Sequence, residues 1–280
     1  MTFSNIRSTW LGLQNIKYLI IFGDSYSAIN AVPLVFFRNL RPTPDKPLGV
    51  DFPGTTYNEP DLPNWVGYLI TEYVKDHQLL VYDYAAGGNT VSGVMNQIDR
   101  FFMPTVGQKP EYAPWTDTDA LFITWIGIND LAYISKDGQM EKSIKKLFLY
   151  QEKLYDNGAR NFLFIDVPPI NRAPAMPQDF EVEKASSFIN WNTCLKQHIT
   201  EFSSTHPDIT TMIFSAYDLF NDILDNPEEH GFPKEDVRKS KGSIWFDHLH
   251  PTSKTHKEIA RAVFQYLLSQ VPPESTQTGP

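Results

Sequence analysis

Cysteine is almost missing from this sequence: Cys194 is the only one among 280 residues. A single cysteine excludes a disulfide within the chain. The sequence also has no Asn-X-Ser/Thr glycosylation site, and residues 1–15 have no continuous apolar stretch of signal-peptide length. These absences favour an intracellular protein, or a secreted one only if a leader has been removed.

Basic clusters and long apolar runs are missing as well. Lys and Arg number 24 against 33 Asp and Glu, so the net charge is −9. Such a chain is not expected to bind nucleic acid or an anionic membrane surface. No run approaches the length of a transmembrane helix, so we expect no integral membrane contact.

No shift in composition marks a linker between domains. We therefore expect residues 1–280 to form one domain. Residues 1–16 have the composition of a loosely attached lead-in, and residues 274–280 that of a disordered tail. The oligomeric state stays open.

Short apolar runs alternate with segments of helical periodicity. Helices are expected around residues 64–74, 91–102, 144–154, 188–202 and 253–270, with a further helix from Ser25 to Val35. The apolar runs predict buried strands at residues 18–22, 79–84, 119–126, 161–167 and 209–214. This alternation is typical of a five-stranded parallel sheet covered by helices on both faces, an α/β/α sandwich of three layers.

Two irregular insertions interrupt this pattern, at residues 30–63 and 103–118. Residues 30–63 hold seven prolines, which are too many for a regular element and predict a long ordered loop. Whether this loop acts as a lid is not decided by the sequence.

Four short polar blocks follow predicted strands or open the last helix. They are Gly23-Asp24-Ser25, Gly87-Gly88-Asn89, Gly127-Ile128-Asn129-Asp130 and Asp247-His248-Leu249-His250. The carboxyl ends of parallel strands lie along one edge of a sheet, where ligand sites gather. We therefore expect these distant blocks to meet there.

The blocks contain the groups that acyl transfer requires. The Ser25 hydroxyl becomes a nucleophile when a base takes its proton, and a histidine such as His250 suits that role. Asp247 could fix the tautomer of the imidazole. The N–H groups of Ser25 and Gly88 and the side-chain amide of Asn129 could bind the developing oxyanion.

Each block alone is more typical of a turn or a helix cap, and only the combination indicates a site. Asp247, His248 and His250 could instead bind zinc. However, no second group of His and Cys has familiar zinc spacing, and the serine block would be left unexplained. We therefore predict no metal and no cofactor.

Together, Gly23-Asp24-Ser25, Gly88, Gly127-X-Asn129 and Asp247-X-X-His250 resemble the four blocks of the SGNH (GDSL-type) hydrolases, in order and spacing from residue 21 to 252. The resemblance implies a flavodoxin-like fold. It implies Ser25 as nucleophile, His250 as general base and Asp247 as orienting carboxylate, with Ser25, Gly88 and Asn129 as the oxyanion donors. Gly87 is an alternative to Gly88, but the following Asn-Thr resembles the family's Gly-X-Thr and favours Gly88.

Two longer stretches, Trp125-Ile-Gly-Ile-Asn-Asp-Leu131 and Trp245-Phe-Asp-X-Leu-His-Pro251, are similar to fungal carbohydrate esterases of family 16. This resemblance implies a serine esterase that removes acetyl groups from sugars or hemicellulose-derived oligosaccharides. We expect four further residues to contact the substrate, namely Asp24, Tyr26, Trp125 and Asp130. Tyr26 stands where the family has Leu, and we expect it to shape the mouth of the pocket.

Other functions stay open. A lipolytic acylhydrolase or lysophospholipase would need an apolar channel, which Phe36, Phe37 and Phe52 could line. A non-catalytic sugar-binding module could stack sugars on Tyr57, Trp65, Tyr112, Trp115 or Trp125, although such aromatics belong more often to the core. A nucleotide-binding protein is disfavoured, because the loop after the first strand lacks Gly-X-Gly-X-X-Gly and a Walker lysine.

Overall fold

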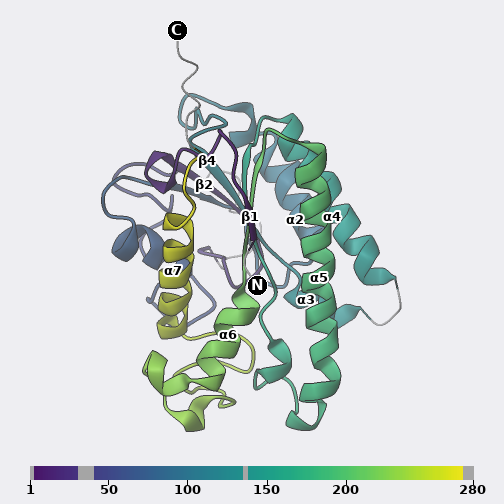
Figure 1. Cartoon of the computed structure of the whole chain (residues 1–280). Helices are drawn as coiled ribbons and strands as arrows, with labels where there is room; N and C mark the ends of the chain where they lie inside the picture. The colour runs from purple at the N-terminus through teal and green to yellow at the C-terminus, as the bar shows by residue number, and fades with distance from the viewer. Residues whose placement is uncertain (1–2, 31–40, 135–137, 274–280) are drawn as a thin grey trace.

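A single sheet of six strands lies at the centre of the computed structural model, which describes residues 3–30, 41–134 and 138–273 (Figure 1). The strand order is β1-β6-β5-β4-β2-β3. The strands are β1 (Phe3–Asn5), β2 (Tyr18–Gly23), β3 (Leu80–Asp83), β4 (Ala120–Trp125), β5 (Asn161–Ile165) and β6 (Thr210–Phe214).

Strands β2 to β6 are parallel, which confirms the predicted five-stranded parallel sheet. Their order is the flavodoxin-like one, and its switch point lies between β2 and β4. Every residue of β2, β4, β5 and β6 is buried. Burial of whole strands is expected where helices cover both faces of a sheet.

The N-terminal segment differs from the predicted loose lead-in. Strand β1 pairs with β6 in the antiparallel direction, with Ser4 opposite Met212. Trp10 is completely buried, and its indole N–H donates to the carbonyl of Gln270 at 2.8 Å. A three-residue edge strand is specified mainly by backbone hydrogen bonds, so the side-chain pattern carries little signal for it.

Helices cover both faces of the sheet (Figure 1). On one face α1 packs against α7, and on the other α4 packs against both α2 and α5. The helices are α1 (Trp65–Tyr68) with its π-helical extension η3 (Leu69–Tyr73), α2 (Val91–Asn96) with its π-helical extension η4 (Gln97–Phe102), α3 (Ile128–Tyr133), α4 (Gln139–Asp156), α5 (Glu181–Thr205), α6 (Ala216–Asp225) and α7 (Ser253–Leu268). The short 3₁₀ turns are η1 (Leu13–Asn15), η5 (Val106–Gln108), η6 (Ile170–Arg172), η7 (Gln178–Phe180), η8 (Pro227–His230) and η9 (Lys234–Asp236).

The helix expected from Ser25 is not formed over residues 25–30, where the carbonyl of Asp24 accepts the N–H groups of Ser27 and Ala28 in a tight turn. The rest of that segment lies outside the described residues, as do Phe36, Phe37 and the predicted tail 274–280. The described part of the loop at residues 30–63 contains only isolated bridges.

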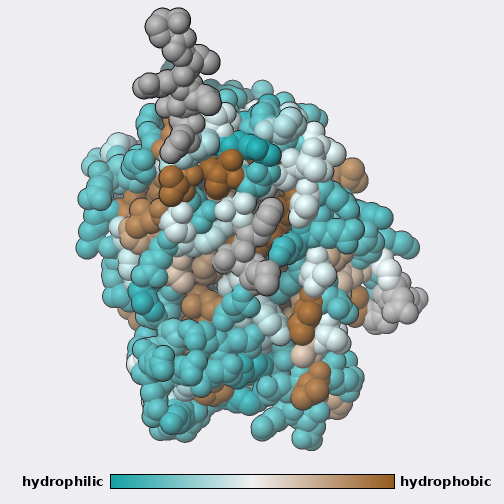
Figure 2. Space-filling view, viewed as in Figure 1, coloured by the Kyte–Doolittle hydropathy of each residue, from teal (hydrophilic) through white to brown (hydrophobic). Residues whose placement is uncertain are grey.

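Hydrophilic residues cover most of the face shown in Figure 2. Among the helices that the structure describes, none combines the length and the apolar character needed to span a bilayer.

Candidate active site

Ser25 lies just beyond the carboxyl end of β2, at the switch point of the sheet. The turn that presents it begins at Gly23, where a Cβ atom would lie 2.6 Å from the carbonyl oxygen of Trp125. Only glycine allows this close approach of two strands. The side-chain amide of Gln97 bonds both the N–H (3.0 Å) and the carbonyl (2.7 Å) of Gly23 and so holds the turn.

The three residues predicted as nucleophile, base and orienting carboxylate meet in one hydrogen-bonded chain. His250 Nε2 lies 3.0 Å from Ser25 Oγ, and His250 Nδ1 lies 2.8 Å from Asp247 Oδ2. The other oxygen of Asp247 accepts the backbone N–H groups of Leu249 and His250, both at 2.7 Å. The carboxylate therefore fixes both the loop and the imidazole.

The charge of Asp247 decides which nitrogen of His250 carries the hydrogen. Burial acts to raise the pKa of Asp247, but hydrogen bonds from His250 and Leu249 outweigh it and hold the pKa below its ordinary value. An ionised carboxylate only accepts hydrogen bonds. Nδ1 must therefore donate, and Nε2 is left to accept the proton of Ser25.

The predicted oxyanion donors come from three loops at the same edge. Asn129 Nδ2 donates to the carbonyl of Asn89 at 2.9 Å, which ties the amide to the loop that holds Gly88. Gly88 has φ +73°, and a Cβ there would meet no atom within 4 Å. Within the described part of the chain, the N–H groups of Ser25 and Gly88 have no hydrogen-bond acceptor.

Gly87 is less open than Gly88. A Cβ on Gly87 would lie 1.9 Å from the hydroxyl oxygen of Tyr57, so this glycine packs against a side chain. Gly88 is exposed, whereas Gly87 is only partly so. The structure thus leaves the Gly88 N–H the more accessible of the two.

The four residues expected to contact the substrate lie beneath the site. Asp24 and Trp125 are 0% exposed, Tyr26 is 1% and Asp130 is 6% exposed. Burial leaves the side chains of Asp24, Tyr26 and Trp125 almost no surface with which to touch substrate, whereas Asp130, no more buried than Ser25, also lines a hollow. Tyr26 instead donates its hydroxyl to the carbonyl of Leu249 at 2.8 Å and packs edge-on against Trp125. These side chains support the loops that carry Ser25 and His250.

The carboxyl groups of Asp24 and Asp130 both have raised pKa values. Burial raises the pKa of Asp24 to about 7, although the N–H of Tyr26 opposes the shift, and the charge of Asp130 adds to it. Burial likewise raises the pKa of Asp130 to about 6, against the N–H of Val91, which approaches both carboxyl oxygens at 3.1 Å. Both groups therefore resist ionisation in the folded chain.

The Asp130→Asn variant is expected to remove part of the pH dependence of stability. Because folding raises the pKa of Asp130 from 3.8 to about 6, its contribution is complete below about pH 4 and is lost as the pH rises through 6. The loss is on the order of 2 kcal/mol. Urea unfolding between pH 4 and pH 7 measures it, since Asn can still accept from Val91. Equal pH slopes in wild type and variant would contradict the assignment.

Tyr57 is a residue of the site whose position the sequence did not reveal. Its ring stacks on His250, with centroids 5.3 Å apart and planes 27° apart, while its hydroxyl lies against Gly87. One side chain thus contacts both the imidazole and the loop of the oxyanion donors. The sequence marked Tyr57 only as one of several aromatics, because the stack joins residues from distant parts of the chain.

We expect Tyr57→Ala to lower kcat by roughly 10 to 100-fold with a smaller change in KM, because misplaced reacting groups cost about this much. Tyr57→Phe keeps the stack on His250 and is expected to lose less than about fivefold. Steady-state kinetics on an acetyl ester measure both variants. A Tyr57→Ala variant with unchanged kcat would show that the stack does not position the imidazole.

Similarity to known proteins identifies the family of this chain. Residues 19–263 match the model of the family described as GDSL-like lipase/acylhydrolase. An acetylesterase of Thermothelomyces thermophilus is 34% identical over 270 residues, covering 88% of this chain and 87% of that protein. A thermolabile hemolysin of Vibrio parahaemolyticus is 24% identical over 235 residues, covering 71% of this chain and 54% of that protein.

Solved structures share the fold. A variant of Axe2, an acetyl xylan esterase from Geobacillus stearothermophilus, superposes with a TM-score of 0.58 at 16% identity, covering 92% of this chain and 99% of that chain. A member of the lipolytic G-D-S-L family from Veillonella parvula gives a TM-score of 0.51 at 12% identity, covering 91% and 100%. The family match spans most of the chain, so this protein belongs to the GDSL-like lipase/acylhydrolase family and is an ester hydrolase.

Proposed function

We propose that this esterase removes acetyl groups from sugar-borne esters through an acyl-enzyme on Ser25. The observation that carries the proposal is the hydrogen-bonded chain from Asp247 through His250 to Ser25. His250 takes the proton of Ser25 as the oxygen attacks the acyl carbon, and gives it to the leaving alcohol. It then takes a proton from water as the oxygen of that water attacks the acyl carbon, and it returns the proton to Ser25 Oγ as acetate leaves.

The developing oxyanion is bound by the backbone N–H groups of Ser25 and Gly88 and by the amide of Asn129. Both N–H groups are unpaired among the described residues, so they need not break a protein hydrogen bond to bind the oxyanion. Donors fixed in advance contribute most to such catalysis, because they do not reorganise during the reaction. Asn129 is held in advance by its bond to the Asn89 carbonyl.

A polar hollow beside these loops supports a sugar as the alcohol. It has a volume of about 420 Å³ and begins at Thr90 and Asp130, next to the proposed oxyanion donors. Hydroxyl, amide and ammonium groups line it alongside Tyr133 and Ile134, and they come from Thr90, Ser92, Gln139, Lys142, Ser143 and Lys146. Such groups hydrogen-bond sugar hydroxyls, whereas a fatty chain needs an apolar wall.

The test compares 4-nitrophenyl esters of increasing acyl length with acetylated xylo-oligosaccharides, in the presence of a chelator. We expect acetyl esters to react fastest. Lys142→Ala is expected to raise KM for the acetylated sugar about fivefold or more and to leave 4-nitrophenyl acetate unaffected. Lys145→Ala, on the same helix but outside the hollow, is the matched control.

Three results would contradict the proposal or part of it. Rates that rise with acyl length would favour a lipolytic acylhydrolase on longer esters. Loss of activity to the chelator alone would instead indicate a metal at Asp247, His248 and His250. An equal effect of Lys142→Ala on both substrates would show that the hollow does not bind the sugar.

A further inference from the structure

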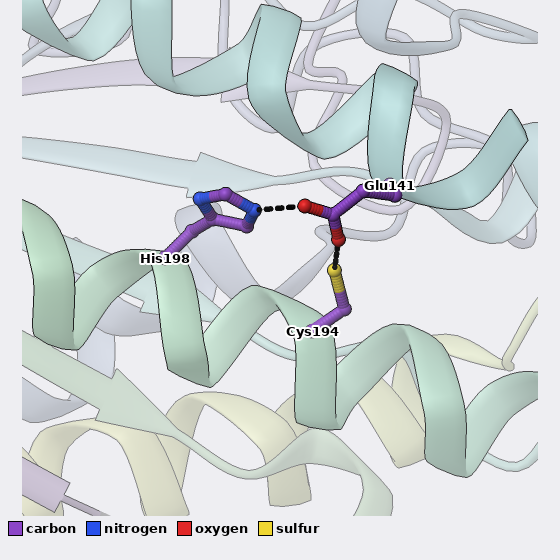
Figure 3. Close-up of side chains that lie close together, drawn as sticks. All are labelled: Glu141, Cys194 and His198. Carbon is purple, nitrogen blue, oxygen red and sulfur yellow. Dashed lines mark hydrogen bonds and ion pairs between the residues drawn. The ribbon is translucent and has the colours of Figure 1, made fainter. Parts of the chain in front are cut away.

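Three side chains with metal-binding groups meet between α4 and α5 (Figure 3). Glu141 comes from the first turn of α4, and Cys194 and His198 lie one turn apart on α5. Cys194 Sγ is 2.9 Å from Glu141 Oε2, and His198 Nε2 is 3.2 Å from Glu141 Oε1. The three ligand atoms all lie within 4.8 Å of one another. Thiolate, imidazole and carboxylate are the groups that bind zinc in proteins.

The orientation of His198 is a second, independent observation. The residue is only 8% exposed, and Phe148 stacks on its ring with centroids 5.5 Å apart. Its Nδ1 lies 3.3 Å from Glu201 Oε2. Metal-binding histidines commonly donate their second ring N–H to a carboxylate in this way, which directs the free nitrogen to the ion. Here that nitrogen is Nε2, and it points at Glu141 and Cys194 (Figure 3).

The contacts of His198 leave two chemical states. When Nδ1 donates to Glu201, Nε2 presents a lone pair to the carboxylate of Glu141, and these two acceptors at 3.2 Å repel unless a cation lies between them. When Nε2 carries the hydrogen, it donates to Glu141 and no metal is needed. The two states differ at Cys194, whose thiol donates to Glu141 in the second and becomes a metal ligand in the first.

We propose that Glu141, Cys194 and His198 form a zinc site that joins α4 to α5, with water in the fourth position. Tetrahedral zinc with its usual bond lengths places such ligand atoms about 3.4 to 3.6 Å apart. The contact of the thiol with Glu141, now 2.9 Å, therefore has to lengthen by about 0.7 Å, and the contact of the imidazole with Glu141, now 3.2 Å, by about 0.2 Å. Lys145 Nζ, now 3.2 Å from Glu141 Oε1 and 63% exposed, turns to solvent when the ion binds.

Zinc must displace the thiol proton, which passes to the solvent. Binding is therefore expected to tighten as the pH rises. The sequence alone did not reveal this group of three residues, because Cys194 and His198 form only a pair in it. The third residue, Glu141, lies 53 residues before Cys194.

The test uses the full chain after chelator treatment and dialysis. Zinc affinity is measured by competition with a chromogenic chelator, and Co²⁺ is added to look for the absorption band of a thiolate-cobalt bond. We expect one ion per chain, a thiolate band, and a melting temperature that rises with zinc. Cys194→Ser and His198→Gln are each expected to weaken binding by about 100-fold.

His206→Gln is the matched control. His206 Nε2 contacts Glu152 Oε2 at 3.0 Å between the same two helices, but this pair has no thiol. Its removal is expected to leave zinc affinity unchanged. A wild-type cobalt spectrum without a thiolate band, or equal zinc affinity in wild type and Cys194→Ser, would overturn the proposal and leave a hydrogen-bonded cluster without a metal. The cobalt spectrum needs no variant, so misfolding of one cannot obscure the result.

Discussion

Replacing Ser25 by alanine is expected to lower kcat on an acetyl ester by about 10⁵-fold or more. The variant removes the oxygen that forms the acyl-enzyme, while His250, Asp247 and the oxyanion donors stay in place. Any remaining activity then comes from water attacking a bound ester. Steady-state kinetics with enough enzyme to detect slow turnover measure this loss.

The fold is expected to survive the Ser25→Ala substitution. Ser25 is buried, but its hydroxyl bonds only His250 among the described residues, and alanine fits the same turn. The melting temperature should therefore stay close to that of wild type. Ser204→Ala is the control for serine removal. Ser204 lies at the end of α5, near the amino ends of the strands and so away from the site. A Ser25→Ala enzyme within tenfold of wild type would exclude a serine nucleophile at this position.

Asp247→Asn is expected to lower kcat by roughly 10³ to 10⁴-fold. The amide oxygen can still accept the N–H groups of Leu249 and His250, which the carboxylate now accepts at 2.7 Å, so the loop is retained. The amide nitrogen, however, donates toward Nδ1 of His250. This favours the tautomer with hydrogen on Nε2, which cannot take the proton of Ser25.

The Asp247→Asn experiment separates tautomer control from loop structure. We expect unchanged far-ultraviolet circular dichroism and a melting temperature within a few degrees of wild type, together with the large fall in kcat. Asp208→Asn is the control, because it removes a carboxylate just before β6, at the amino ends of the strands and away from the site. It should leave kcat unchanged. An active Asp247→Asn enzyme would mean that another group orients His250.

Much of the architecture was predictable because strand and helix signals are local. Five apolar runs predicted the five parallel strands, and the apolar positions of the helix at residues 144–154 are the buried face of α4. Strand β1 was missed, because three residues at an edge show no period. The expected helix after Ser25 does not form over residues 25–30, where Asp24 closes a turn instead.

The sequence by itself determined which residues are the candidates for the chemistry. Each polar block follows a strand or opens a helix, and the parallel sheet brings strand ends to one edge, so short motifs sufficed to name Ser25, Asp247 and His250. Tertiary structure alone decided what surrounds them. Burial of Asp24, Tyr26, Trp125 and Asp130, the stack of Tyr57 on His250, and the meeting of Glu141 with Cys194 and His198 depend on packing between distant segments. No local pattern encodes such contacts, because they arise only when helices and loops close over the sheet.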